Sequence, residues 1–390
     1  MRQAYIVAAK RTAVGKAKRG GFRNFRSDDL AVEVIKALAK EAGLTEDGQV
    51  DDVIVGCANP EGEQGLQIGR QISLRALGKA TPGITINRYC ASGLEAVAMA
   101  TAKIRAGMGD IFIAGGTESM SMIPMTGYKL APNYQVAKET PDYIISMGLT
   151  AEAVAEKYKV SREDQDEFAL RSHSNAARAI KSGYFKEQII PVEVPEVTVE
   201  SGERVEKTNT VEVDEGVRTD TSMEALSKLR PVFAKKGSVT AGNSSQTSDG
   251  AAFVLVMSEE KVKELKLEPI GRLVSCSVAG VDPLYMGIGP CAAIPKALKS
   301  AGLKLHDIDL IELNEAFAAQ SLAVVREAGL NPDIVNVNGG AIALGHPLGC
   351  TGAKLTTQIL SELKRRNKKY GMVTACVGGG QGIAGILERF

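Results

Sequence analysis

Short apolar runs alternate with segments of helical periodicity along the first part of the chain. Residues 5–9, 52–56 and 110–116 are almost entirely apolar and predict buried strands. Residues 29–42 place apolar side chains at helical spacing and end at a glycine, and residues 65–77 are also predicted to be helical. Strands and helices in this order indicate an α/β fold with a mostly parallel sheet that is covered on both faces.

The same alternation returns in the last third of the chain. Strands are expected at residues 251–257, 273–278, 309–313, 335–337 and 372–377, and residues 383–388 are predicted to close the chain as an edge strand. Helices are expected at residues 292–301, 316–328 and 351–366.

The stretch between these two regions differs in composition and in its pattern of predicted elements. Residues 117–240 contain scattered Met, Pro, Tyr and Asn, two predicted helices and a polar β-like passage at residues 191–213. The second helix opens with the capping pattern Ser161-Arg-Glu-Asp164. We interpret 117–240 as an inserted, lid-like loop domain. Residues 1–116 and 241–265 then form one half of the core, and residues 266–390 form the other.

The two halves also resemble each other in sequence. Lys36-Ala-Leu38 matches Lys296-Ala-Leu298, and Asn87, which follows a short strand, matches Asn338. The offset between matched elements drifts slowly along the chain, which indicates a duplicated βα unit. Two similar α/β halves are therefore expected to pack around a pseudo-twofold axis.

Composition excludes several classes of protein. The 390 residues are 44% hydrophobic, enough for a large interior. The 47 basic and 46 acidic residues leave a net charge of +1, so nothing drives the chain toward nucleic acid or an anionic membrane. The six cysteines form no CxxC pair and no zinc pattern. No signal peptide or membrane-spanning run is recognisable, and a reduced, cytoplasmic protein is expected.

Cys90 is the first candidate for chemistry. It follows a short strand around Ile84 and Ile86, predicted to be buried, and precedes an apolar helix at residues 91–105. A cysteine at a helix N-terminus meets free N–H groups and the helix dipole, and both favour the thiolate. Cys90 is therefore a candidate nucleophile. A small, buried hydrophobic side chain is the alternative interpretation.

His346 lies in a glycine-rich loop that corresponds to the loop of Cys90 in the other half. If the halves are equivalent, the two loops face one another, and a Cys–His pair across an interface makes an activated nucleophile. A satisfied core histidine is the less favoured alternative. The other two histidines, His173 and His306, are predicted to lie on the surface.

Two further stretches carry polar groups at strand ends. Cys376 enters the run Val-Gly-Gly-Gly-Gln-Gly382, whose N–H groups can point at an oxyanion. Too little chain follows this run for a dinucleotide-binding motif. Asn314 ends the strand at residues 309–313 and can hold a water or donate to a carbonyl oxygen; a helix N-cap is its structural alternative.

These motifs together resemble the thiolases. The matching blocks are Asn87-Arg-Tyr-Cys90-Ala-Ser-Gly, Asn314-Glu-Ala-Phe317, the glycine-rich loop around His346, and Cys376-Val-Gly-Gly-Gly. The resemblance runs from about Ile6 to Glu388. It implies two βαβαβαββ halves that form a five-layer αβαβα core, with a loop domain inserted in the first half.

The resemblance also implies a role for each residue. Cys90 is the expected nucleophile, His346 the base that activates it, and Cys376 the acid/base at the acetyl-CoA α-carbon. Asn314, through a water, and His346 are expected to form one oxyanion hole. The N–H groups of Cys90 and Gly378 are expected to form the second.

A second set of residues matches positions along the coenzyme A channel, namely Arg218, Phe233, Ser245 and Phe317. Coenzyme A is then a co-substrate, with no permanently bound cofactor and no metal. The resemblance further implies acyl-CoA substrates and at least a homodimer. A homotetramer and a β-oxidation multienzyme partner are further expectations, and neither nucleic acid nor membrane insertion is expected.

Within the family, the chain looks more like the degradative, broad-specificity 3-ketoacyl-CoA enzymes. Ser146 occupies a position before Met-Gly where acetoacetyl-CoA enzymes commonly carry a histidine. An acetoacetyl-CoA thiolase that runs the Claisen condensation remains an alternative. A decarboxylating ketosynthase is disfavoured by Cys376 in its glycine run. A non-catalytic acyl-CoA- or lipid-binding protein of the same fold would be expected to lack one reactive group, and none is missing.

Overall fold

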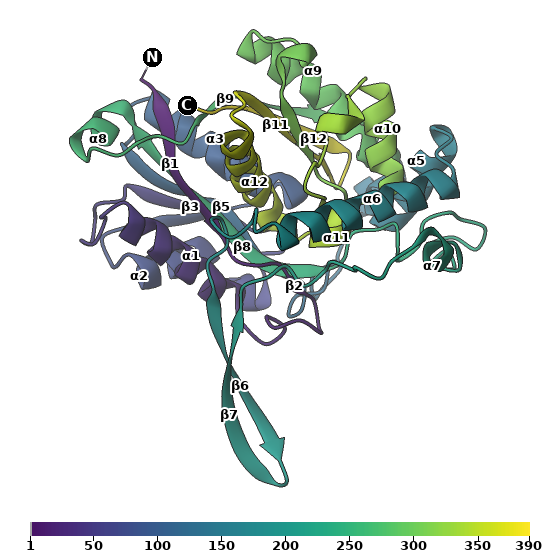
Figure 1. The fold of residues 1–390 in the computed structure, drawn as a ribbon, viewed down its shortest axis with the longest axis horizontal. Coiled ribbons are helices and arrows are strands. Elements are labelled where there is room, and N and C mark those ends of the chain that lie inside the picture. The colour runs from purple at the N-terminus through teal and green to yellow at the C-terminus, as the bar shows by residue number, and fades with distance from the viewer. Residues whose placement is uncertain (1) are drawn as a thin grey trace.

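Two mixed sheets form the core of the computed structural model, which describes residues 2–390 (Figure 1). The first sheet has the order β1-β8-β5-β3-β4, with β2 beside β8. Its strands are β1 (Ala4–Arg11), β2 (Gly15–Lys16), β3 (Asp52–Gly56), β4 (Gly83–Ile86), β5 (Ile111–Ser119) and β8 (Ser248–Ser258). The second sheet has the order β10-β11-β12-β9. Its strands are β9 (Arg272–Gly280), β10 (Leu310–Leu313), β11 (Tyr370–Val377) and β12 (Gln381–Glu388).

The strand order confirms the duplication. In the first half β4, β3 and β5 run parallel, and β8 lies antiparallel between β5 and β1. In the second half β10 and β11 are parallel, and β12 lies antiparallel between β11 and β9. The counterpart of β4 is reduced to one parallel bridge between Ile311 and Val335.

Three expectations about these strands were wrong. The sheets are mixed rather than mostly parallel, because the last strand of each half returns antiparallel. β12 is an inner strand and not an edge. The strand predicted at residues 335–337 amounts to the single bridge at Val335.

Alternating side chains explain why the strands are apolar on both faces. On β8, Phe253 and Leu255 join the cluster beneath α1 (Ser27–Glu41) and α2 (Ile68–Ala76), while Val254 and Val256 join the cluster around α3 and α12. Successive residues of a strand point to opposite faces, so a doubly covered strand is apolar throughout.

The helices complete five layers. α3 (Ser92–Arg105) and α12 (Thr351–Arg366) fill the space between the two sheets. α9 (Gly289–Ala301) and α10 (Ala318–Glu327) pack on the far face of the second sheet. The resulting order is αβαβα, as the family resemblance implied. The short helix α8 (Glu259–Glu264) leads from β8 toward the second half.

Glycines let the two central helices meet. A Cβ on Gly93 of α3 would lie 2.6 Å from the backbone nitrogen of Ala353, and a Cβ on Gly352 of α12 would lie 2.2 Å from that of Leu94. Both distances are shorter than any ordinary carbon contact, so neither position has room for a side chain. The N-terminal turns of α3 and α12 therefore touch, one from each half.

The segment between β5 and β8 lies outside the sheets. Its elements are α4 (Tyr134–Glu139), α5 (Met147–Lys157), α6 (Arg162–Lys181), β6 (Val192–Glu200), β7 (Glu203–Val211) and α7 (Met223–Ser227). α5 and α6 pack on α10, and α6 also contacts the short α11 (Ala341–Leu344). The antiparallel hairpin β6–β7 projects away from the body (Figure 1). The insertion thus covers the second half at the loop that carries His346.

β4 is an open edge of the first sheet. Ile84, predicted to be buried, has 37% of its surface exposed, and Ile86 is only partly covered. The prediction failed because β3 covers one side of β4, whereas no strand of residues 2–390 pairs with its other side.

Replacing Gly352 with Ala tests the close contact of the central helices. We expect the added methyl group to lower the free energy of unfolding by about 1–3 kcal/mol, because the opposing atom is backbone and cannot rotate away. Gly280→Ala is the matched control, because its Cβ would meet nothing nearer than 4.0 Å. Urea unfolding of the two variants gives the comparison, and equal stabilities would contradict the prediction.

Candidate active site

The turn that carries Cys90 joins β4 to α3. It contains a 3-10 turn at Tyr89–Ala91. The backbone φ of Tyr89 is 45°, a positive value that residues other than glycine rarely adopt. The Ser92 hydroxyl locks the turn by accepting from the N–H of Arg88 (2.8 Å) and donating to the carbonyl of Tyr89 (2.7 Å). The side chain of Asn87 accepts the N–H of Tyr89 (2.8 Å). The predicted strand-to-helix position of Cys90 is confirmed.

The Cys90 residue is half-buried, and its thiol meets backbone donors. The N–H groups of Gly378 and of Cys90 itself are directed at the sulfur and favour the thiolate, but burial outweighs them and raises the pKa of Cys90 to about 12. We expected a thiol activated by its position at the helix. Desolvation reverses that expectation, because the same packing that brings the donors excludes water. The resting group is therefore a thiol that needs a base.

Cys376 lies close to Cys90 from the opposite half. It is buried near the end of β11, and Gly378 follows two residues later. Burial raises the pKa of Cys376 well above its usual range, and the neighbouring Cys90 adds to that effect. Two thiols and two inward-facing N–H groups, those of Cys90 and Gly378, thus share a site, and both thiols are protonated at neutral pH.

His346 is a buried, neutral imidazole of defined tautomer. The Thr351 hydroxyl donates to the carbonyl of Pro347 (3.0 Å), so it meets Nδ1 of His346, 2.5 Å away, as an acceptor. This places the ring proton on Nδ1 and leaves the lone pair on Nε2. Burial, helped by the charge of Lys354, lowers the pKa of His346 to about 3. The ring is therefore neutral at rest, and Nε2 is the atom at which it can take up a proton.

Asn314 is the neighbour of that lone pair. It follows β10, where its N–H donates to the carbonyl of Thr374 on β11 (2.9 Å). Its Nδ2 lies 3.3 Å from Nε2 of His346. The buried Oδ1 of Asn314 has no hydrogen-bond partner among the described residues, so it can accept from a water or a substrate. The structure contradicts its alternative as a helix N-cap, because α10 begins at Ala318 after Phe317.

The turns that carry these groups touch one another. The turn at Tyr89–Ala91 contacts the turn at Leu348–Cys350, which follows His346, and it also contacts β11. Cys90, Cys376 and Gly378 therefore form one cluster, and the paired His346 and Asn314 belong to the adjoining loops. No group of described residues offers three metal-ligating side chains together.

Two of the four predicted channel residues meet. The rings of Phe233 and Phe317 form a T-shaped contact with 6.0 Å between centroids. Phe233 is 39% exposed and Phe317 is buried, so the pair leads from the surface inward. The N–H of Ser245 donates to the carbonyl of Ala316, next to Phe317 (2.9 Å). The side chain of Arg218 is exposed.

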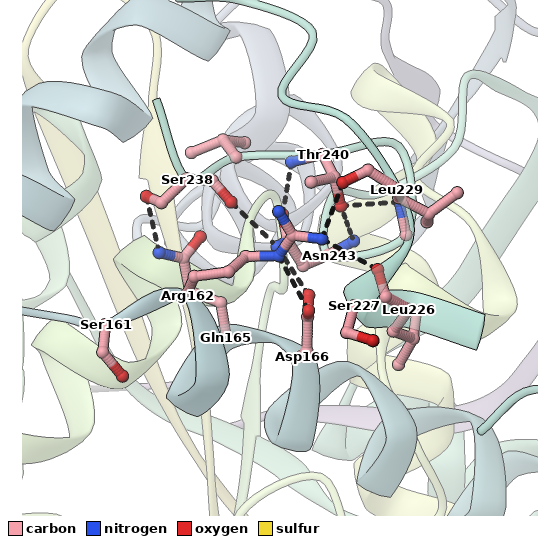
Figure 2. Close-up of polar contacts among 12 residues, drawn as sticks. Ser161, Arg162, Gln165, Asp166, Leu226, Ser227, Leu229, Ser238, Thr240 and Asn243 are labelled. Atoms are coloured by element: carbon pink, nitrogen blue, oxygen red, sulfur yellow. Dashed lines mark hydrogen bonds and ion pairs between the residues drawn. The ribbon is translucent and has the colours of Figure 1, made fainter. Parts of the chain in front are cut away.

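A polar network around the buried Asp166 and Asn243 holds the segment before Ser245 (Figure 2). Asp166 on α6 accepts from Arg162 (2.7 Å) and from Nδ2 of Asn243 (2.9 Å). Arg162 also donates to the carbonyls of Leu226 (2.8 Å) and Leu229 (2.9 Å) at the end of α7. The inserted domain is thereby fastened to the segment that leads back into β8.

His173 does not lie on the surface as predicted. It is 5% exposed, and its Nδ1 accepts the N–H of Arg218 (3.1 Å). Polar neighbours along α6 suggested an exposed face, but residues 214–218 cover this position from a distance in sequence. His306 is exposed, as predicted.

Three polar residues of the site were not singled out from the sequence. Thr351 sets the tautomer of His346, and Glu118 and Glu315 are buried carboxylates that contact the His346 loop. The only signal was position, because each follows a predicted strand or stands beside a motif residue. A partner supplied by another part of the chain cannot be read from that position alone.

The profiles of two protein families match nearly the whole chain. The N-terminal thiolase domain matches residues 4–260, and the C-terminal thiolase domain matches residues 267–389. The chain belongs to the thiolase family.

Individual thiolases match over the full length. The 3-ketoacyl-CoA thiolase of Bacillus subtilis (strain 168) is 55% identical, with 100% of both chains covered. The peroxisomal 3-ketoacyl-CoA thiolase 1 of Arabidopsis thaliana is 44% identical over 98% of this chain and 87% of the plant protein. The crystal structure of the Bacillus anthracis acetyl-CoA acetyltransferase superposes with a TM-score of 0.89 at 42% identity, covering 100% and 99% of the two chains.

The buried His173 gives the thiolase a pH-dependent stability. Burial lowers the pKa of His173 to about 4. As pH falls below about 6.5, His173 takes up a proton in the unfolded chain but stays neutral in the folded protein. Protonation therefore stabilises the unfolded state, and the free energy of unfolding decreases. His173→Asn should reduce the loss of unfolding free energy between about pH 7 and pH 5 by roughly 2 kcal/mol. Urea unfolding at both pH values measures this, with the exposed His306→Asn as control. An unchanged loss in His173→Asn would refute it.

Proposed function

We propose that the chain is a 3-ketoacyl-CoA thiolase, an acetyl-CoA C-acyltransferase. It cleaves a 3-ketoacyl-CoA with coenzyme A to acetyl-CoA and a shortened acyl-CoA, as in fatty acid β-oxidation. The observation that supports this best is the pairing of two thiols from opposite halves, with the N–H groups of Cys90 and Gly378 directed at one of them. A carbon–carbon cleavage needs both a nucleophile and a separate proton donor for the carbon that leaves.

In the proposed first half-reaction, Nε2 of His346 takes the proton of Cys90, and the sulfur attacks C3 of the substrate. The new oxyanion on C3 meets the N–H groups of Cys90 and Gly378. The C2–C3 bond then breaks, and its electron pair leaves as the enolate of acetyl-CoA. Asn314, through a water, and His346 stabilise the enolate oxygen, and Cys376 protonates the carbon.

In the second half-reaction, the Cys376 thiolate takes the proton of the coenzyme A thiol. The resulting sulfur attacks the acyl group on Cys90, the bond between that carbonyl carbon and the Cys90 sulfur breaks, and the shortened acyl-CoA leaves. The expelled Cys90 thiolate takes back its proton from His346, which returns the site to its resting state. Because a covalent intermediate separates the two products, ping-pong kinetics are expected. Two neutral thiols and a neutral imidazole suit this scheme, since each donates or accepts a proton without a buried charge at rest.

The channel for coenzyme A is proposed along Phe317, Phe233 and Ser245, with Arg218 at the exposed end. The T-shaped ring pair supports an apolar passage for the pantetheine arm, and a guanidinium is suited to phosphate. Coenzyme A enters as a co-substrate, and no resident cofactor or metal is part of the proposal.

The second candidate is an acetoacetyl-CoA thiolase that runs the condensation, which the similarity to the Bacillus anthracis acetyltransferase favours. Two observations support the degradative function instead. The identity to the Bacillus subtilis 3-ketoacyl-CoA thiolase is greater, and Ser146 stands at the start of α5. A non-catalytic acyl-CoA- or lipid-binding role has no support in a site that retains every reactive group.

Domain division, assembly and location are also proposals. We propose halves of residues 1–116 with 241–265 and of residues 266–390, and a loop domain of residues 117–240. The open edge at β4 supports a homodimer, and the exposed Met125, Leu130 and Tyr134 support a homotetramer. We propose a cytoplasmic enzyme that works beside a β-oxidation partner. No helix of residues 2–390 is long and apolar enough to cross a membrane.

The decisive measurement is loss of acetoacetyl-CoA and of 3-ketohexadecanoyl-CoA on addition of coenzyme A. Wild type should consume both, and Cys90→Ala should consume neither. Asn314→Ala should lower kcat roughly 100-fold, because the oxyanion loses the water that Asn314 is proposed to hold. Faster cleavage of the long substrate supports the degradative function, and faster cleavage of the short one favours the alternative.

Two results would overturn these assignments. No coenzyme A-dependent loss of either substrate would overturn the thiolase function. Stoichiometric alkylation by iodoacetamide at a residue other than Cys90 would overturn the choice of nucleophile.

A further inference from the structure

Two buried carboxylates have no part in the proposed chemistry. Glu118 lies one residue before the end of β5 in the first half, and Glu315 follows Asn314 in the second. Each is 1% exposed. Burial raises the pKa of both carboxyls, whereas the hydrogen bonds that each accepts lower it. A carboxylate buried at this depth is costly unless donors surround it, so its partners indicate what it serves.

Glu118 joins three segments of chain. One oxygen accepts from the N–H of Ala58 (2.8 Å) and from the N–H of Gly349 (2.8 Å). The other accepts from Nε2 of Gln64 (2.6 Å) and, at 3.3 Å, from the N–H of Asn59. Gly349 lies three residues after His346, so this carboxylate of the first half holds the His346 loop of the second.

Glu315 holds the opposite end of that loop. One oxygen accepts from the Ser172 hydroxyl (2.6 Å) and from the N–H of Ile342 (3.2 Å), and the other accepts from Nδ2 of Asn336 (2.8 Å). Ser172 in turn accepts the N–H of Gly340 (3.0 Å). Since Ser172 belongs to α6, the inserted domain contributes to the same anchor.

Glycines allow the two carboxylates to approach the loop. A Cβ on Gly349 would lie 2.9 Å from the Glu118 oxygen, and a Cβ on Gly340 would lie 2.1 Å from the carboxyl carbon of Glu315. A side chain at either place would push the loop off its anchor. Between the anchors, Nε2 of Gln246 donates to the carbonyls of Ile342 (3.4 Å) and Ala343 (3.1 Å), and the N–H of His346 donates to the Ser248 hydroxyl (3.1 Å).

We propose that Glu118 and Glu315 are positioning residues that fix both ends of the loop of residues 340–349 and so hold His346 in place opposite Cys90. The inference rests on the proposed function. Neither carboxylate touches the reacting atoms. Glu118 matters most, because its bond to Gly349 joins the half that carries the nucleophile to the half that carries the base.

Glu118→Gln keeps the length of the side chain but turns an NH2 group toward N–H donors. Glu118→Asp keeps the charge but is one methylene too short to reach Ala58 and Gly349 together. We expect both to lower kcat at least tenfold while KM changes less than threefold, because binding groups stay in place and proton transfer depends on distance. Glu315→Gln should act in the same direction.

The control is Asp28→Asn. Asp28 is another buried carboxylate of the first half, paired with Arg26 (2.8 Å) and Arg75 (3.3 Å) on the outer helices. Its loss should lower the melting temperature without changing kcat. Melting temperature, stoichiometric alkylation of Cys90 by iodoacetamide, kcat and KM are measured for all variants, so that a loss of fold is separated from a loss of position.

The positioning role of Glu118 and Glu315 is refuted if Glu118→Gln and Glu315→Gln have the same kcat as Asp28→Asn while wild type is active. Inactive wild type would instead refute the proposed function. If the glutamine variants fail to fold, Gly349→Ala decides, since it keeps both carboxylates while its Cβ, 2.7 Å from Cα of Cys57 and 2.9 Å from the Glu118 oxygen, forces the loop away from its anchor. Folded Gly349→Ala with wild-type kcat would then overturn the proposal.

Discussion

The contact between the N-terminal turns of α3 and α12 is the constraint on which the rest of the structure depends. Gly93 and Gly352 let backbone meet backbone across the two halves. Helices that approach so closely bring together the turns that precede them. The turn before α3 carries Cys90, and the turn before α12 directly follows the segment of His346. A duplicated fold thus gives two equivalent loops, and their meeting makes one site with different chemistry on each side.

Exclusion of water is the second consequence of this packing. Three groups of the site favour their neutral forms, namely the thiols of Cys90 and Cys376 and the imidazole of His346. Burial removes the water that would stabilise their charged forms. A site of neutral groups relies on proton transfers between neighbours and on fixed N–H donors. Position then matters more than charge, which gives the buried anchors of the His346 loop their importance.

The inserted domain takes part in the hydrogen bonds that hold the loop of His346 and the segment before Ser245. α6 contributes Ser172 to one anchor, and Arg162 and Asp166 hold the segment that leads to Ser245 (Figure 2). An insertion that reaches both the loop of the base and the proposed channel couples the lid to the site through buried hydrogen bonds.

The sequence by itself determined the duplicated α/β core, the insertion and the turn position of Cys90, because apolar periodicity, repeated segments and glycine-rich turns are local signals. Only the tertiary structure decided the antiparallel return of β8 and β12, the exposed edge at β4 and the burial of His173. It also decided the raised pKa of Cys90, which local sequence suggested would fall. These properties depend on which distant segments cover a residue, and desolvation by such segments leaves no mark in the residues beside it.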